Sequence, residues 1–360
     1  MSFTYPNNYF LSSVSSNGFL SLFDENLSPS DYTTVFILKG SVGMKKSDAL
    51  ISVAERLNER GITVFLAQNP RNPDLVEGVF APDVKLAAVI GSFPHNLDEK
   101  IGGIREIAVD FNAARDNSVL KATSAEIISA YNEREAYFGR AGRYLSAARS
   151  LLGDSFMMAA DVTDGDRAAK FGMMAAAKLL GKRRSGKGRE TRRFLSAVTP
   201  RGLVFRDDTL LDAADRFFII DDRFSAAAKI IIAAIRYSAI ELGLDVISCV
   251  CPLFPDRAEH VIVPELRVAF CTENRYLSLG ADLRRYHSRR FMDMSALSSR
   301  RQRLLFNKKA TDELISGCVG ALKAAQVQNE LISSYYDRAR RPDVTDEITY
   351  SLLRQVDASV

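Results

Sequence analysis

A short segment of the chain carries the residue types and spacing of a phosphate-binding loop. Residues 40–47 read Gly-Ser-Val-Gly-Met-Lys-Lys-Ser, and the loop pattern is G-x-x-x-x-G-K-[ST]. In such a loop, backbone N–H groups surround the phosphates, the lysine neutralises the β- and γ-phosphates, and the final hydroxyl holds Mg²⁺. The residues that we expect to bind ATP or GTP in this way are Gly40, Ser41, Gly43, Lys45, Lys46 and Ser47, with Mg²⁺ on Ser47.

Lys45 departs from the pattern, which has a glycine immediately before its lysine. A Cβ at that position costs on the order of 1–2 kcal/mol if the backbone φ is positive. An added cation beside the phosphates would offset part of that cost. Lys45 therefore leaves two alternatives open: a working loop, or one whose phosphate-binding geometry is lost.

Hydrolysis of a nucleotide would also need a carboxylate near Mg²⁺ or near the attacking water. Asp74, Glu77 and Asp83 are candidates, and each could equally be a loop cap or a surface charge. His95 follows Pro94 and is expected at the carboxyl edge of a sheet, where ligands bind in α/β folds, unless it is a simple turn residue.

The elements around the loop predict a parallel βαβ unit. Residues 34–38 are apolar and β-branched, which is typical of a strand buried on both faces. A helix is expected over 47–60, because its apolar residues lie on one stripe, and Gly61 would end it. Strands are expected over 62–67 and, after a proline-rich loop, over 84–90.

The chain contains one unit twice. Residues 61–87 and 243–269 align without a gap and share nine identities in 27 positions, including three prolines. We expect a first copy over 1–180, a basic linker over 181–193 and a second copy over 194–360.

Each copy is expected to end in a helical arm, over about 122–180 and about 296–356. Each arm would be two helices, broken near an Asp-Val-Thr-Asp sequence and forming a hairpin packed on the sheet or projecting from it. The residues expected to begin the second helix of each arm are Asp161 or Thr163, and Asp343 or Thr345.

The second copy has lost the loop pattern. Residues 222–229 contain no glycine, and Ala228 stands at the position of Lys46. Asp221 and Asp222 would face a phosphate there, and at ~4 Å each repels it by about 1 to 4 kcal/mol. We expect a strand-to-helix turn that does not bind a triphosphate.

The composition is that of a globular protein long enough for two domains. Of its 360 residues, 47% are hydrophobic and 26% are charged, which excludes a mainly disordered chain. Glycine, proline and cysteine are too few for a collagen or a disulfide scaffold, and no apolar run approaches the ~20 residues of a membrane helix. Residues 1–6 lack the charged start and apolar stretch of a signal peptide, so we expect a cytoplasmic protein.

Positive charge is concentrated in two segments. Residues 182–193 carry a net charge of +6 and residues 284–309 a net charge of +8, in a chain whose total is +4. Two interpretations stay open. The segments bind a protein or nucleic-acid partner, or they are a solvated linker and a solvated helix face.

The chain resembles the uncharacterised bacterial tandem P-loop NTPase family, whose members are described as ATPase-like or nucleotide-kinase-like. The resemblance implies an α/β fold of tandem duplicated P-loop NTPase-like domains with mostly parallel sheets and helical arms, and it implies nucleotide binding. The family tends to have an acidic residue before Gly91, where this chain has Ile90. The matching residues of the first copy are 36–40, Gly43, Lys46, Ser47, 59–61, Pro73, Asp74, 77–79, Pro82, Pro94 and His95. Those of the second copy are 196–202, Pro255, Asp256, 259–261 and 264–266.

Three functions are therefore weighed. The first is a nucleotide-binding protein or weak ATPase that acts through the first copy alone. The second is a pseudo-NTPase scaffold that binds a protein or nucleic acid through its helical arms or basic segments. The third is a small-molecule kinase.

Overall fold

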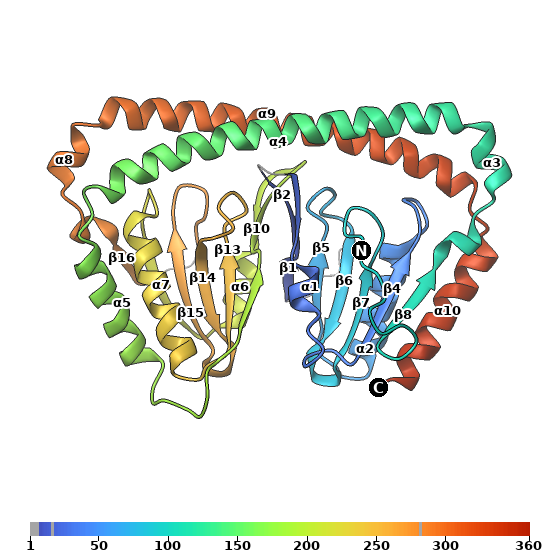
Figure 1. Cartoon of the computed structure of the whole chain (residues 1–360), viewed down its shortest axis with the longest axis horizontal. Helices are drawn as coiled ribbons and strands as arrows, with labels where there is room; N and C mark the ends of the chain where they lie inside the picture. Colours follow the sequence, from blue (N-terminus) through green and yellow to red (C-terminus); the bar gives the residue numbers. More distant parts are fainter. Residues whose placement is uncertain (1–6, 16–17, 281–282) are drawn as a thin grey trace.

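The computed structural model describes residues 7–15, 18–280 and 283–360. The expectation drawn from residues 1–6 falls outside this part of the chain. Within it, the protein has a mixed α/β fold with two six-stranded sheets, which lie side by side beneath two long helices (Figure 1).

The first sheet is mostly parallel, and the predicted strand 34–38 lies in it next to the edge strand. Three of its five strand pairs are parallel, and β4 lies between two of the parallel partners. The strands follow the order β1 (Asn8–Phe10), β5 (Phe65–Gln68), β6 (Val76–Ala81), β7 (Leu86–Ile90), β4 (Thr34–Lys39) and β8 (Glu106–Asp110).

Strand β6 corrects the prediction of a continuous proline-rich loop before residue 84. It is buried along its length and runs antiparallel to both β5 and β7. The prolines lie outside it, because Pro70 and Pro73 precede it and Pro82 begins the 3₁₀ turn η1 (Pro82–Val84) that follows. Proline is compatible with such flanking positions although it interrupts a strand interior.

The second sheet repeats the first. Phe65 pairs with Phe80 across β5 and β6, and Ile247 pairs with Ile262 across the matching strands. Both strand pairs also contain a bulge at the same position. The strands follow the order β9 (Glu190–Arg193), β13 (Val246–Val250), β14 (Ala258–Val263), β15 (Val268–Glu273), β12 (Arg216–Asp221) and β16 (Arg285–His287).

The expected linker over 181–193 is shorter in the structure. Its last four residues form β9, which pairs in parallel with β13 at the edge of the second sheet. Next to it, Phe10 and Phe194 exchange two backbone hydrogen bonds of 2.9 Å, so the edges of the two halves are bonded directly.

One apolar core continues from the first sheet to the second. It contains Phe65 and Phe80 of the first half together with Ile219 and Ile262 of the second. The helices α1 (Phe23–Asn26) and α6 (Asp207–Ala213) contribute Phe23 and Leu210 to it. Two hairpins, β2 (Ser12–Ser15) with β3 (Gly18–Ser21) and β10 (Ser196–Thr199) with β11 (Gly202–Phe205), contribute Val14 and Val198 to a separate apolar cluster.

Two long helices lie above both sheets, and each begins over one half and ends over the other. Helix α4 (Ser124–Ala160) runs from the first half to the second, and α9 (Arg301–Arg338) runs back beside it in the opposite direction (Figure 1). We refer to this pair as the helical roof. It is preceded at its two ends by η2 (Phe111–Ala114) with α3 (Asn117–Ala122), and by η4 (Ser288–Phe291) with α8 (Met294–Ser298).

The short helices after the roof therefore cover the other half's sheet. Helix α5 (Gly165–Leu179) packs on α7 (Ala226–Glu241) of the second half. Helix α10 (Pro342–Ala358) packs on α2 (Lys46–Glu59) of the first half. Each arm does contain two helices broken near the expected sequence, but the arms are shared between the halves.

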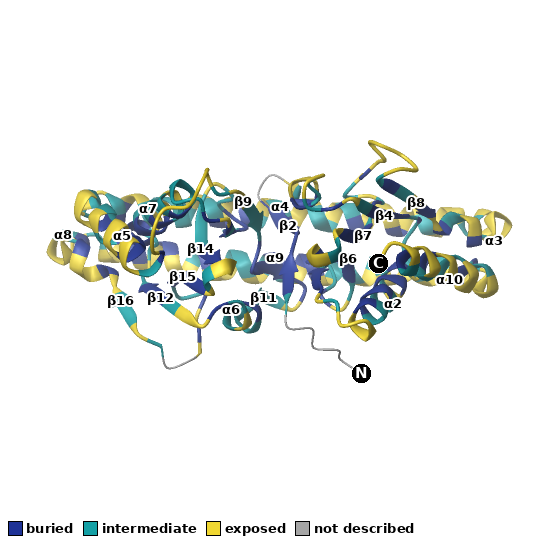
Figure 2. Cartoon of the chain, turned by 90° about the horizontal axis from the view of Figure 1, so that it is seen from below, coloured by how far each residue is buried: buried dark blue, intermediate teal, exposed yellow. Residues whose placement is uncertain are grey.

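The residues that begin the short helices differ from those expected. Asp164, not Asp161 or Thr163, is the N-cap of α5, and its carboxylate accepts a 2.9 Å hydrogen bond from the Arg167 N–H. Arg341 stands at the N-cap of α10. Figure 2 shows that α5 and α10 keep exposed residues on their outer faces, whereas the strands between them are largely buried. A search of the described helices for a stretch long and apolar enough to cross a membrane finds none.

Candidate functional site

The loop between β4 and α2 contains three residues with positive φ angles. Gly40 and Gly43 have positive φ angles of 145° and 74°. Lys45 is also left-handed, with a φ of 58°, and is the N-cap residue of α2. The position where the pattern has glycine thus keeps the left-handed conformation with a lysine in it, at a cost of about 1 kcal/mol or slightly more.

Lys46 folds back over the loop. Its residue is only 8% exposed, and its ammonium group donates to the carbonyl of Gly40, to the carbonyl of Ser41 at 2.8 Å and to Ser92 Oγ at 3.4 Å. Burial lowers the pKa of Lys46 to about 8. All three partners are neutral, so within the part of the chain that the structure describes this buried cation has no counterion in direct contact.

The start of α2 offers unpaired donors beside Lys46. Among the described residues, the backbone N–H groups of Met44–Asp48 have no hydrogen-bond acceptor. Such groups carry the positive end of the helix dipole. Ser47 Oγ accepts a 2.8 Å hydrogen bond from the Val76 N–H, which leaves its proton and a lone pair for another partner. The Mg²⁺ role of Ser47 stays a prediction.

A large cavity opens over this loop. Its volume is about 1070 Å³, and it lies between the carboxyl end of the parallel strands and the helical roof. All six loop residues expected to bind nucleotide line it. At Gly43 the roof comes close, because a Cβ there would lie 2.5 Å from the backbone oxygen of Ser333 in α9. Glycine is therefore required at this position for two reasons, the positive φ angle and the close approach of the Ser333 backbone.

Two of the remaining candidates meet in the same cavity. The side chains of Glu77 and His95 are buried, and His95 Nε2 lies 3.2 Å from Glu77 Oε1. Glu77 also accepts a 2.7 Å hydrogen bond from Ser12, and His95 Nδ1 lies 3.2 Å from Ser21 Oγ. The four side chains form one polar network beneath the β2–β3 hairpin.

The other acidic candidates lie elsewhere. Asp74 is exposed and pairs with Arg201 of the second half, and Asp83 is exposed in η1. Neither lines the cavity.

Three arginines of the cavity were not singled out from the sequence. They are Arg71 from the loop after β5, Arg115 after η2, and Arg134 of α4. Arg115 Nη1 lies 3.4 Å from Ser41 Oγ and 3.1 Å from Asn112 Oδ1. No local motif marks these residues, but the repeat alignment contains one signal, since Arg71 faces Leu253 in it.

In the second half, the corresponding helix start is closed by its own side chain. Asp222 is fully buried, and its carboxylate accepts hydrogen bonds from the N–H groups of Ala228 at 2.9 Å and Phe224 at 3.1 Å. Burial raises the pKa of Asp222 above its ordinary value. Instead of standing free to repel a phosphate, this carboxylate already holds the N–H groups that a phosphate would need.

Replacing Asp222 with alanine should lower the free energy of unfolding by about 1–3 kcal/mol, because two buried N–H groups lose their acceptor. The measurement is urea denaturation. The control is Asp221→Ala, whose exposed carboxylate pairs with His287 and should change stability by less than about 1 kcal/mol. Equal losses in the two variants would contradict this role of Asp222.

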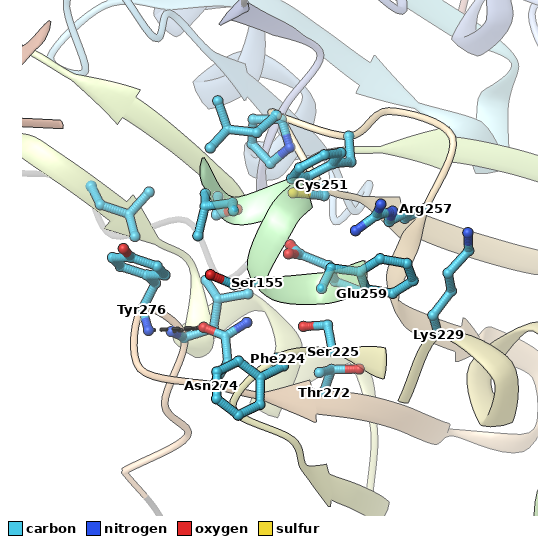
Figure 3. Close-up of a pocket in the computed structure, with 18 of the residues that line it drawn as sticks. Ser155, Phe224, Ser225, Lys229, Cys251, Arg257, Glu259, Thr272, Asn274 and Tyr276 are labelled. Carbon is cyan, nitrogen blue, oxygen red and sulfur yellow. Dashed lines mark hydrogen bonds between the residues drawn. The ribbon is translucent and has the colours of Figure 1, made fainter. Parts of the chain in front are cut away.

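The second half has a small pocket beside the corresponding helix start. Its volume is about 130 Å³, and Phe156, Phe224 and Phe254 are part of its lining. Figure 3 shows Cys251, Glu259 and Arg257 together on one side of it, with Asn274 and Tyr276 on the opposite side. Burial raises the pKa of Glu259 to about 7, although a hydrogen bond with Cys251 and the Arg257 charge lower it.

Much of the basic charge faces carboxylates of the chain itself. In 182–193, Arg189 lies 2.6 Å from Asp31, and Arg192 lies 2.8 Å from Glu25, so both connect the second sheet's edge to the first half. In 284–309 the arginines with carboxylate partners are Arg285 with Glu273, Arg300 with Asp161 and Arg303 with Asp154. A polyanionic partner at either segment stays a prediction.

The described residues contain no group of three His, Cys, Asp or Glu side chains placed to hold a metal ion. The cysteines Cys249, Cys251, Cys271 and Cys318 are free thiols. Comparison of the chain with protein-family models, with curated proteins and with solved structures found no match to any of them.

Proposed function

We propose that the first half binds a nucleoside triphosphate, ATP or GTP, with its phosphates on the loop 40–47, as a P-loop NTPase-like unit does. The observation that carries this proposal is Lys46, a buried cation without a counterion beside unpaired N–H groups at the start of a helix. Burying a charge is costly unless an opposite charge meets it, so this arrangement favours an anion. The cavity above it is large enough for a nucleotide.

The second half is not part of the proposed site. The loop there is two residues shorter than expected from the alignment, so Ala226 and not Ala228 stands at the position of the lysine. Asp222 accepts the hydrogen bond of the Ala228 N–H at the helix start. Its pocket of about 130 Å³ is too small for a nucleotide. In this proposal the chain carries one nucleotide.

Weak hydrolysis of that nucleotide is a further part of the proposal. Glu77 is the candidate to position water, since it lies in the cavity with His95, whereas Asp74 and Asp83 do not. Glu77 is already engaged by Ser12 and His95, which favours slow turnover over an efficient ATPase.

Calorimetric titration with Mg-ATP and Mg-GTP tests the proposal. Wild-type protein should bind at micromolar concentration, and Lys46→Ala should weaken binding by at least about tenfold, because a charge-assisted hydrogen bond is worth ~1.5–3 kcal/mol. Because the free Lys46 has a pKa of about 8, binding at pH 8 should also take up a proton, and the measured heat should depend on the buffer.

The matched control is Lys229→Ala, which removes one positive charge from the pocket of the second half. It should leave affinity unchanged. Absence of binding at millimolar nucleotide would overturn the proposal and leave the scaffold function, for which the roof offers exposed apolar residues such as Val327 and Leu331, one turn apart on α9.

A further inference from the structure

Arg71 is a second cation of the cavity, and no carboxylate of residues 7–15, 18–280 or 283–360 forms an ion pair with it. Its guanidinium lies between two rings, with its central carbon 4.6 Å from the centre of Phe19 and 4.0 Å from that of Phe138. Its Nε is buried and has no hydrogen-bond partner. Burial lowers the pKa of Arg71 to about 10. Stacked rings leave only the edge of a guanidinium for ligands, and that edge fits a phosphate or a carboxylate.

The carboxylates nearest to Arg71 are committed to other groups. Glu77 accepts a hydrogen bond from Ser12 and lies 3.2 Å from His95 Nε2, and Glu135 pairs with Arg134 at 3.0 Å. Both raise the pKa of Arg71 through space, but among the described residues neither forms an ion pair with it. Arg134 is close enough to lower that pKa, so two guanidinium groups repel each other at this wall.

The two halves can be matched here residue by residue. The Asp116 N–H donates to the Ala339 carbonyl as the Asp293 N–H donates to the Val162 carbonyl, which matches Arg115 with Met292. The shared bulge and register of the two sheets match Arg71 with Leu253. The left-handed N-cap residues Lys45 and Ser225 match Lys46 with Ala226, because the loop of the second half is two residues shorter. The residues at the positions of Lys46, Arg71, Arg115 and Arg134 in the second half are therefore Ala226, Leu253, Met292 and Thr311.

The four matching positions of the second half therefore carry uncharged side chains, and the cations that line its small pocket, Arg223, Lys229 and Arg257, stand at other positions. Arg71 and Arg134 lie on the wall formed by the β5–β6 loop and α4, away from the helix start that Lys46 occupies. Cations that served only to stabilise the fold would have no reason to be missing together with the phosphate loop. Their joint absence indicates that they belong to one ligand site.

We propose that Arg71, flanked by Arg134, binds a second anionic group, and that the cavity takes a ligand set with phosphate on the loop 40–47 and a phosphate or carboxylate at Arg71. This rests on the proposed function. The second group belongs either to the nucleotide itself, at the end far from its triphosphate, or to a phosphorylated or carboxylated co-substrate beside it. In either case the anion neutralises the positive charge of Arg71.

Inorganic pyrophosphate is the probe that separates the two anion positions. Calorimetric titration of the full chain should give two equivalents per chain for the wild type. Lys46→Ala should lose one, and Arg71→Leu, which copies Leu253, should lose the other. Arg223→Ala, in the pocket of the second half, is the charge control and should keep both.

Each result decides between the two proposals. One equivalent that disappears in Lys46→Ala and survives in Arg71→Leu overturns the second anion position and leaves the proposed function standing. One equivalent that disappears only in Arg71→Leu overturns the proposed function instead. Should Arg71→Leu fail to fold, Arg71→Lys keeps the charge without the planar edge, and the affinity of its second equivalent should fall about tenfold.

A competition arm identifies where the second group comes from. If pyrophosphate still binds one equivalent to protein saturated with Mg-ATP, and Arg71→Lys weakens it, the group belongs to a co-substrate. If a nucleotide with an added 3′-phosphate binds more tightly than its parent, and Arg71→Lys removes the difference, it belongs to the nucleotide. Failure of both overturns the inference.

Discussion

Replacing Leu352 with alanine should destabilise the first half although the residue belongs to the second copy of the sequence. Leu352 is fully buried on α10, in the same apolar cluster as Leu50 and Val53 of α2. A leucine truncated in such a core lowers the free energy of unfolding by about 2–5 kcal/mol. Urea denaturation measures that loss, and hydrogen exchange should locate the lost protection in α2.

Leu180→Ala is the matched control, because it tests α5, the helix of the first copy that covers the second half. Leu180 follows α5 and is buried against α7, in the core of the second half. Its truncation should cost a similar amount and expose α7, leaving α2 protected. If Leu352→Ala increased exchange in α7 instead, α10 would cover its own half, and the exchanged arrangement would be wrong.

Glu259→Gln should stabilise the protein at alkaline pH. The pKa of Glu259 is raised from 4.5 to about 7 in the folded chain. Between these values the unfolded chain releases the proton and the folded chain holds it, so stability falls as pH rises from about 4.5 to 7. Glutamine does not titrate. The variant should therefore match wild type at pH 4 and exceed it by at most about 3 kcal/mol at pH 8.

The figure of about 3 kcal/mol is an upper limit because Glu259 borders the small pocket, where water reaches part of the side chain. Urea denaturation at pH 4 and pH 8 measures the difference. The neighbouring His260 has its pKa lowered to about 3 by burial, so its effect falls below pH 6.5 and is common to both proteins. Glu126→Gln, at an exposed position, is the control, and an equal gain there would contradict the assignment.

The sequence determined the local parts of this protein. The apolar run of β4, the helix after it and the loop between them follow from nearest neighbours, since strand burial and helix amphipathicity are local patterns. The repeat alignment predicted one unit present twice, and the aligned residues 61–87 and 243–269 contain strand pairs with the same register and bulge. Strand β6 was missed because prolines come shortly before and directly after it in the sequence, which made the whole segment resemble a loop.

The tertiary structure decided which half each arm covers. Helices α5 and α10 each have an apolar face that could pack on either sheet, and nothing in their own sequences chooses. The choice follows from α4, whose 37 residues form a rod of about 55 Å that carries α5 across to the other half. A sequence pattern predicts the length of a helix, but it does not predict which part of the fold the end of that helix reaches.

The candidate site divides in the same way. The loop 40–47 is one continuous segment, so its residues could be read from the sequence together. Arg71, Arg115 and Arg134 come from three separate elements, and only the folded chain brings them to one cavity. Asp222 shows the reverse case. Its charge predicted repulsion of a phosphate, whereas the fold turns that carboxylate onto the helix start, because a buried N–H group needs an acceptor.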